Sequence, residues 1–377
     1  MSQIDDDNST IFTILLSEYG QVLHPPLVLV LCISGALGHM LTITTLSSML
    51  NPTNLFLISM SCSQLALCIN FLYSTFFKFM SDTLCQPFFF SFYMASTMHF
   101  SVTISVMVHM SAVFHVVGLS LIRYASLRQL SKSVNSNIPW FTWQKSKGAI
   151  LLIYITVLIL CIPLHFTTIL AEVHENEGCA ERYPSLRNKI AYQLAYTTDL
   201  WLRNLNYWLF YLASKVVPSI ILCLMTCMIL DQLKKIQVLS SRFSNVERDK
   251  QHQRTTNMIL AIMVLFIIVE LPQGVLAVLS TFTTVRLIHD LGDVTELLTL
   301  FTSIIIFTLL CSMNGRIRSA FKDVACVRRV LRVLSRMCPP SSSPIRATTS
   351  GHDALIEHNT IIITNCHIDK SENYAVL

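Results

Sequence analysis

The sequence predicts an all-α fold: a bundle of seven transmembrane helices, with the N-terminus outside the cell and an amphipathic eighth helix on the cytoplasmic side. Only 13% of the 377 residues are charged and 53% are hydrophobic, whereas soluble domains carry about 25% charged residues. Seven apolar stretches are long enough to cross a bilayer, and lysine and arginine gather in alternate connecting segments. This composition excludes a disordered chain, a coiled coil, a collagen and an ordinary cytosolic enzyme.

The seven apolar stretches account for most of the chain. A membrane helix needs about 20 mostly apolar residues, and the runs that meet this requirement are 26–48, 54–77, 88–122, 148–170, 205–230, 255–280 and 287–313. The third run is longer than one span needs, so we expect a tilted helix together with a loop at membrane level. Lys215 and Pro218 interrupt the fifth run, and Glu270 and Pro272 lie in the sixth.

The basic residues predict the orientation of these helices. The first 25 residues contain no lysine or arginine, whereas the segments after the third, fifth and seventh runs hold most of the cations. Basic segments stay in the cytoplasm, which predicts an extracellular N-terminus (1–25), a membrane domain (26–313), a juxtamembrane amphipathic helix (314–338) and a disordered cytoplasmic tail (339–377). The net charge of +5 is therefore expected to face the inner membrane surface and not nucleic acid.

Several residues are candidates for covalent modification. Asn8 begins an Asn-X-Ser/Thr glycosylation acceptor in the predicted external N-terminus. Cys85 and Cys179 lie in the first and second predicted external loops, where an oxidising environment favours a disulfide between them. Cys326 and Cys338 follow the last span in a basic stretch and are either palmitoylated or free thiols.

Three ionisable residues lie inside the predicted spans, where an unpaired charge is costly. His109 precedes Arg123 by 14 residues, about 21 Å of helix, and Lys215 and Glu270 lie about 24 Å from the cytoplasmic ends of their runs. Because the three reach one depth, we expect Glu270 to meet His109, Lys215 or both. The contact is either a static clamp or the floor of a ligand pocket, and Pro272 favours a kink beside it.

Other classes of membrane protein fit less well. An opsin needs a lysine in its last span, which 287–313 lacks. A transporter would show paired repeats, and an intramembrane enzyme would show two aspartates at depth or a metal-binding motif. We therefore expect no catalytic residues, no cofactor and no metal site, and we interpret His99, His115 and His165 as hydrogen-bonded core residues.

Four short motifs carry a resemblance to a known family. They are Pro52-Thr53-Asn54-Leu55, Leu205-Asn206-Tyr207-Trp208, Lys215-Val216-Val217-Pro218 and Glu270-Leu271-Pro272-Gln273-Gly274. Over about residues 26–325 the chain resembles a rhodopsin-like G-protein-coupled receptor, and more closely the invertebrate myosuppressin/FMRFamide-like peptide receptors with their nematode branch. The resemblance implies a multi-pass plasma-membrane receptor for an extracellular neuropeptide ending in Arg-Phe-amide. It implies coupling to a heterotrimeric G protein of the inhibitory type and allows arrestin as a further partner.

The resemblance also suggests residue roles. The expected ligand pocket comprises His109, Lys215, Glu270, Gln273, Tyr207 and Trp208. The expected G-protein contact comprises Arg123 and Tyr124 at the inner end of the third span. The ligand's arginine calls for a carboxylate, and the candidates by location are Glu177, Asp199, Asp290, Asp293 and Glu296.

The chain departs from the rhodopsin-like pattern at its polar positions. Ile122 replaces the acidic residue before the inner arginine, Gln64 replaces the sodium-site aspartate, and His39 replaces the first-span asparagine. Ile306 and Leu310 stand where the last-span asparagine and tyrosine are usual. These losses predict weak or absent sodium modulation, and they leave open an atypical low-output or decoy receptor that lacks normal G-protein signalling.

Overall fold

The computed structural model describes residues 18–132, 141–173, 179, 190–240, 246–280, 286–313, 315 and 317–319. The chain divides into a unit of residues 1–318 and a second unit of residues 319–377. Within the described residues, seven helices are long and apolar enough to span a membrane. The predicted seven-helix bundle is therefore confirmed, whereas the N-terminal orientation and the eighth helix stay predictions.

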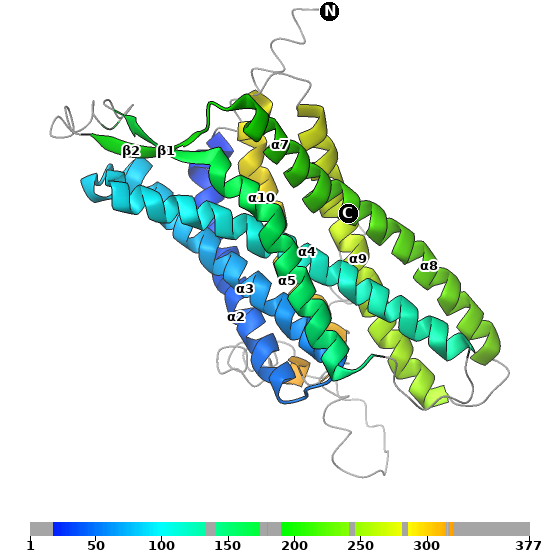
Figure 1. Cartoon of the computed structure of the whole chain (residues 1–377). Coiled ribbons are helices and arrows are strands. Elements are labelled where there is room, and N and C mark those ends of the chain that lie inside the picture. Colours follow the sequence, from blue (N-terminus) through cyan, green and yellow to red (C-terminus); the bar gives the residue numbers. More distant parts are fainter. Residues whose placement is uncertain are drawn as a thin grey trace, which may run out of the picture. The chain divides into compact units, whose positions relative to one another are not determined.

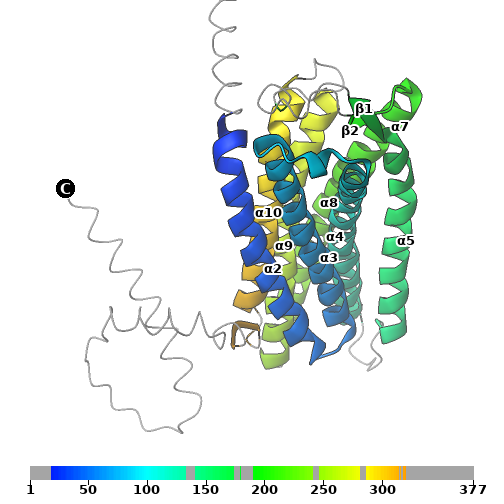
Figure 2. The same cartoon turned by 90° about the vertical axis from the view of Figure 1, so that its left-hand side faces the viewer.

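The helices run, in order, as α2 (His24–Ser47), α3 (Pro52–Lys78), α4 (Phe92–Lys132), α5 (Trp143–Thr167), α7 (Leu200–Tyr211), α8 (Val217–Ser240), α9 (Val246–Ser280) and α10 (Arg286–Met313). Helix α4 packs on α3, α5, α8 and α9, and α10 closes the ring against α2 and α9 (Figures 1 and 2). Helix α5 is peripheral, because only 11% of its apolar window is buried, against 33–50% for the other spans. Its outer side chains are therefore expected to face lipid.

Capping residues explain where two helices begin. The Asn51 side chain accepts a hydrogen bond from the Asn54 backbone nitrogen at 2.7 Å, and Pro52 occupies the first helical position of α3, where a missing N–H costs nothing. The Asp199 carboxylate accepts hydrogen bonds from the backbone nitrogens of Trp201 and Leu202 and so caps α7. Both caps satisfy N–H groups that the helix itself leaves free.

Helix boundaries differ from the apolar runs. The third run splits into a 3₁₀ turn, η3 (Pro87–Phe90), and the continuous helix α4, which extends ten residues past Ile122. The fifth and sixth helices likewise begin before their apolar runs. Hydropathy marks the part of a helix that meets hydrocarbon, whereas backbone hydrogen bonding continues into polar segments.

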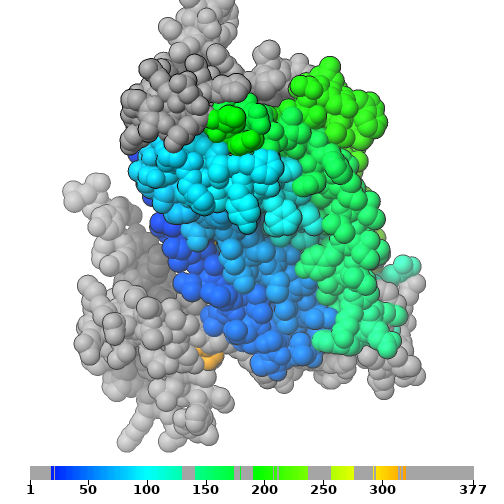
Figure 3. Space-filling view, turned by 60° about the vertical axis from the view of Figure 1, so that its left-hand side comes forward, coloured from blue at the N-terminus to red at the C-terminus, as the bar shows by residue number. Residues whose placement is uncertain are grey.

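A β-hairpin was not predicted. Strands β1 (Thr168–Val173) and β2 (Ala191–Tyr196) pair antiparallel, with Thr168 opposite Tyr196 and Val173 opposite Ala191. The assignment of residues 168–170 to the fourth span is therefore wrong; those residues are extended, as β-branched residues favour. Figure 3 shows the hairpin above the start of α4, with α5 beside it.

The predicted disulfide between Cys85 and Cys179 is confirmed. Both cysteines are buried and pack with Phe90 and Ala191, so the bond ties the segment before α4 to the segment between β1 and β2. We call this end of the bundle the disulfide end and the opposite one the Arg123 end. The largest buried apolar cluster lies toward the Arg123 end and includes Val116, Met225, Ile259, Met263 and Phe266.

Candidate functional site

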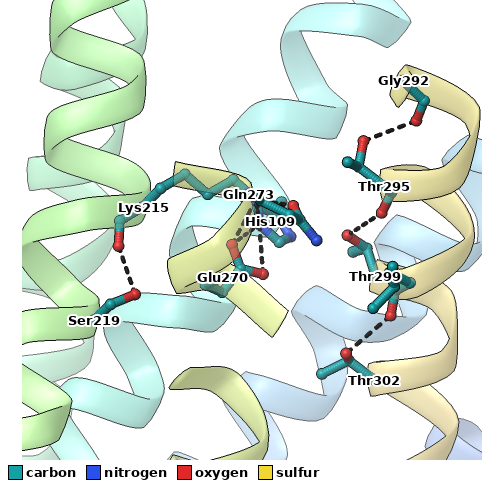
Figure 4. A network of polar contacts seen from close by, with 10 residues as sticks. His109, Lys215, Ser219, Glu270, Gln273, Gly292, Thr295, Thr299 and Thr302 are labelled. Carbon is teal, nitrogen blue, oxygen red and sulfur yellow. Dashed lines mark hydrogen bonds and ion pairs between the residues drawn. The ribbon is translucent and has the colours of Figure 1, made fainter. Parts of the chain in front are cut away.

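Four polar side chains from three helical segments meet inside the bundle toward the disulfide end (Figure 4). They are His109 on α4, Lys215 before α8, and Glu270 and Gln273 on α9, and we call them the polar centre. The Lys215 ammonium donates to Glu270 Oε2 and to Gln273 Oε1 at 2.9 Å, and it lies 3.0 Å from His109 Nε2, which in turn lies 3.3 Å from Glu270 Oε2. The contact of Glu270 with both His109 and Lys215, expected from their common depth, is therefore present.

Burial makes this arrangement energetically important. Glu270 is 2% exposed, Lys215 7% and His109 9%. The Glu270 carboxylate and the Lys215 ammonium offset each other's charge. Hydrogen bonds within the polar centre replace the water that each group loses on burial. An ammonium has three hydrogens and no acceptor, and Glu270, Gln273 and His109 all lie within hydrogen-bond distance of it. The centre therefore holds a buried ion pair whose hydrogen bonds depend on each other.

A break in helix geometry presents Lys215 to the centre. Lys215 lies in a π-helical turn, η5 (Leu212–Val216), that joins α7 to α8. Pro218 follows within one turn and cannot donate a backbone hydrogen bond, which favours such an irregular turn. The Ser219 hydroxyl donates to the Lys215 carbonyl at 2.7 Å and satisfies this acceptor locally.

Helix α9 approaches Lys215 closely because of Gly274. A Cβ atom at Gly274 would lie 2.9 Å from Lys215 Cβ and 3.1 Å from Val216 Cγ2. Glycine is therefore needed for the backbones to come this near. Pro272, two residues earlier, removes one backbone hydrogen bond of α9. Beside Glu270, helix α9 therefore both approaches the Lys215 segment closely and lacks one of its own backbone hydrogen bonds.

A second tie joins α4 and α9 at the Arg123 end. Arg123 Nε donates to the Thr256 hydroxyl at 2.7 Å, and Thr256 is fully buried. Thr256 precedes Glu270 by 14 residues, and His109 precedes Arg123 by 14. The two ties are therefore the same distance apart on both helices, about 21 Å, and α4 and α9 make both contacts in one conformation. Sequence reasoning did not identify Thr256, since a threonine gives no signal of its partner.

The positions that depart from the rhodopsin-like pattern carry either polar side chains without a carboxylate or apolar side chains. Gln64 is buried, and its Oε1 has no hydrogen-bond partner among the described residues. His39 Nε2 contacts the Ser303 hydroxyl at 2.9 Å between α2 and α10. Ile306 and Leu310 are fully buried in the apolar cluster. The described residues therefore place no carboxylate at the level where a sodium ion would need one.

Other residues predicted to bind the ligand have different surroundings. Trp208 on α7 is 47% exposed. Asp199 caps α7, and Glu296 on α10 lies 3.7 Å from His24 Nε2, an ion-pair distance that was not predicted. The following fall outside the described residues, whole or in their side chains: Asn8, Glu177, Tyr207, Asp290, Asp293, Cys326 and Cys338.

The three histidines that we interpreted as core residues, His99, His115 and His165, have different surroundings. His115 is buried, with Nδ1 against the Ser111 carbonyl and Nε2 at 2.8 Å from the Ser59 hydroxyl. This confirms a hydrogen-bonded core residue. His99 and His165 stack with ring centroids 4.7 Å apart, and His165 is exposed, so the core interpretation is wrong for His165. Within the described residues, no three His, Cys, Asp or Glu side chains gather to hold a metal ion.

Comparison with known proteins gives the family. Residues 24–328 match the family model described as the serpentine type 7TM GPCR chemoreceptor Srw. The chain belongs to the Srw family. It is also similar to the G-protein coupled receptor dmsr-1 of Caenorhabditis elegans, with 27% identity over an alignment that covers 89% of this chain and 74% of that protein.

Family membership decides the broad function. Srw proteins are receptors and not enzymes, and the seven spans make this Srw receptor a multi-pass protein of the plasma membrane. The predicted resemblance to a nematode G-protein-coupled receptor is therefore confirmed.

Proposed function

We propose that this Srw receptor binds an extracellular neuropeptide ending in Arg-Phe-amide and activates a heterotrimeric G protein. The peptide enters from the disulfide end, and the G protein meets Arg123 and Tyr124 at the opposite end. The observation that carries the proposal is the pair of ties between α4 and α9, one at the polar centre and one at Arg123–Thr256. A change at either end of α9 is thereby coupled to the other.

The polar centre supports a ligand-sensitive role. A ligand changes a two-state equilibrium only by binding one state better than the other. A peptide that contacts Lys215, Gln273 or His109 changes the partners of a buried ion pair, and the energy of such a pair is sensitive to lost hydrogen bonds. Pro272 lets α9 bend beside this contact. The centre is thus suited to favour one conformation of α9 when a ligand binds.

Glu296 is our choice for the acid that pairs with the ligand's arginine. Its side chain is 16% exposed, so it is partly desolvated but still accessible. It precedes Thr299 by three residues on α10 and therefore shares a helix face with that buried threonine. Asp199 is a weaker choice, because its carboxylate accepts two backbone hydrogen bonds as the cap of α7, whereas Glu296 lies 3.7 Å from His24, beyond hydrogen-bond distance.

The remaining assignments belong to the same proposal. Residues 1–25 form the extracellular N-terminus with Asn8 glycosylated, residues 314–338 form the juxtamembrane helix, and residues 339–377 form the cytoplasmic tail. Arrestin is a further partner. The alternative of a low-output or decoy receptor is not favoured, since the family and the similar C. elegans protein are both described as G-protein-coupled receptors.

A recruitment assay tests the proposal. Cells that express the receptor at their surface are exposed to a library of amidated neuropeptides, and recruitment of each G-protein class is measured. We expect a response confined to peptides that end in Arg-Phe-amide, with the inhibitory class recruited best. A surface-expressed receptor that responds to none of these peptides refutes the proposal.

A further inference from the structure

The amide of Gln273 has a fixed orientation with unused donors. Lys215 can only donate, so the Gln273 atom 2.9 Å from its ammonium is the oxygen, and the NH₂ group faces away. Gln273 Nε2 is buried and has no acceptor among the described residues. Figure 4 shows Gln273 between Lys215 and helix α10. A buried donor without a partner favours any ligand that brings an acceptor to it.

Helix α10 presents the opposite chemistry. Thr295, Thr299 and Thr302, which we call the threonine column, lie along one side of the helix (Figure 4). Each hydroxyl donates its single hydrogen to a backbone carbonyl of its own helix at 2.8–2.9 Å. Their remaining lone pairs can therefore accept hydrogen bonds but not donate them. Since α9 and α10 pack together, a donor from Gln273 and acceptors from Thr299 face the same region.

We propose that Gln273 and Thr299 bind the primary carboxamide at the C-terminus of the peptide; this inference rests on the proposed function. The carboxamide oxygen accepts from the Gln273 NH₂ group, and its nitrogen donates to the Thr299 hydroxyl. A primary carboxamide supplies both an acceptor and a donor and carries no charge. Gln273 is the binding donor, and Thr299 determines the specificity.

The same groups discriminate against a free carboxylate. A carboxylate has acceptors only, so it satisfies Gln273 but gives nothing to Thr299. The Lys215 ammonium already contacts Glu270, Gln273 and His109, so the carboxylate gains little from it. The carboxylate would also lie near Glu270, which is one helical turn from Gln273 and carries like charge. The polar centre therefore favours amidated peptides over their acids.

Three forms of one peptide distinguish the effect of the terminal N–H donor from the effect of the terminal charge. Phe-Met-Arg-Phe-amide, its methyl ester and its free acid are compared in G-protein recruitment by the full-length receptor in membranes. The ester is neutral and keeps the acceptor but lacks the donor. Thr299→Val removes the acceptor of the receptor with little change in shape. Thr308→Val is the matched control, since Thr308 makes the same bond to its own helix but is exposed.

The expected result is a specific pattern of potencies. The wild type prefers amide to ester by about tenfold, the worth of one buried hydrogen bond, and rejects the acid more strongly. Thr299→Val reduces the ratio of amide potency to ester potency to near one. Thr308→Val and the rescue variant Thr299→Ser leave this ratio unchanged. Gln273→Met weakens amide and ester equally, because both keep the carbonyl. If Thr299→Val fails to reach the surface, Thr299→Ala replaces it.

Two failures are distinguishable. If no amidated peptide of the library recruits G protein to the surface-expressed wild type, the proposed function is refuted and this inference with it. If the amide is active but its ratio to the ester is the same in the wild type and Thr299→Val, only the carboxamide site is refuted.

Discussion

Replacing Glu270 by glutamine leaves the Lys215 ammonium buried without a counter-charge. Breaking a buried ion pair by removing one partner typically costs about 3–5 kcal/mol of stability. This range applies here because Glu270 is only 2% exposed. Lys215→Met leaves the Glu270 carboxylate without its counter-charge but costs less, because His109 Nε2 remains 3.3 Å from that carboxylate as a polar partner. In Glu270→Gln, by contrast, the polar centre contains no other carboxylate that could pair with Lys215. We therefore expect Glu270→Gln to be more damaging than Lys215→Met.

The double variant makes the test decisive. Lys215→Met with Glu270→Gln removes both charges, so it should recover much of the stability lost in Glu270→Gln, with a coupling of about 1–3 kcal/mol. The assay is the melting temperature of the ligand-free receptor in nanodiscs, with the exposed pair Lys235 and Asp231 neutralised in the same way as the control. The reasoning is refuted if the two single losses simply add in the double variant.

Three further changes test other parts of the molecule. Thr256→Val removes the hydrogen bond that the Thr256 hydroxyl accepts from Arg123 and should raise agonist-free G-protein recruitment about tenfold; unchanged basal activity at equal surface expression contradicts the tie. Gly274→Ala places a Cβ 2.9 Å from Lys215 Cβ and should destabilise the receptor by about 1–3 kcal/mol, measured as a lower melting temperature. Agonist affinity should be equal in sodium and in a bulky organic cation, because the uncharged Gln64 replaces the carboxylate; a clear sodium effect would overturn this.

Hydropathy and residue spacing predicted the features that depend on solvent partition and helix rise. The seven spans follow from apolar length alone, and the common depth of His109, Lys215 and Glu270 follows from counting residues at 1.5 Å each. The disulfide followed once Cys85 and Cys179 were assigned to the same side of the membrane. These inferences use one dimension of the structure, the distance along the bilayer normal.

The features that were missed depend on rotation about the helix axes. Counting gives the level of Lys215 and its contact with Glu270 but not its hydrogen bond to Gln273, since this depends on the π-helical turn that re-aims its side chain. Thr256 lies at the right depth to meet Arg123, yet several hydroxyl residues share that depth. The hairpin at Thr168 was missed because its apolar residues continue the fourth run, and periodicity cannot separate a short apolar strand from the end of a helix.

The position of Pro272 gives the two ties unequal sensitivity. Glu270 lies two residues from this weak point and Thr256 sixteen, which correspond to about 3 Å and 24 Å of helix. If α9 bends at Pro272, a displacement at Glu270 is therefore amplified roughly eightfold at Thr256. A shift of about 0.5 Å in the polar centre, within the range of a rearranged hydrogen bond, moves Thr256 by about 4 Å. That movement exceeds the tolerance of a hydrogen bond, so the bond between Arg123 and Thr256 breaks while the polar centre changes only slightly. A peptide that rearranges Lys215, Glu270 and Gln273 does not need to break their contacts outright to open the Arg123 end.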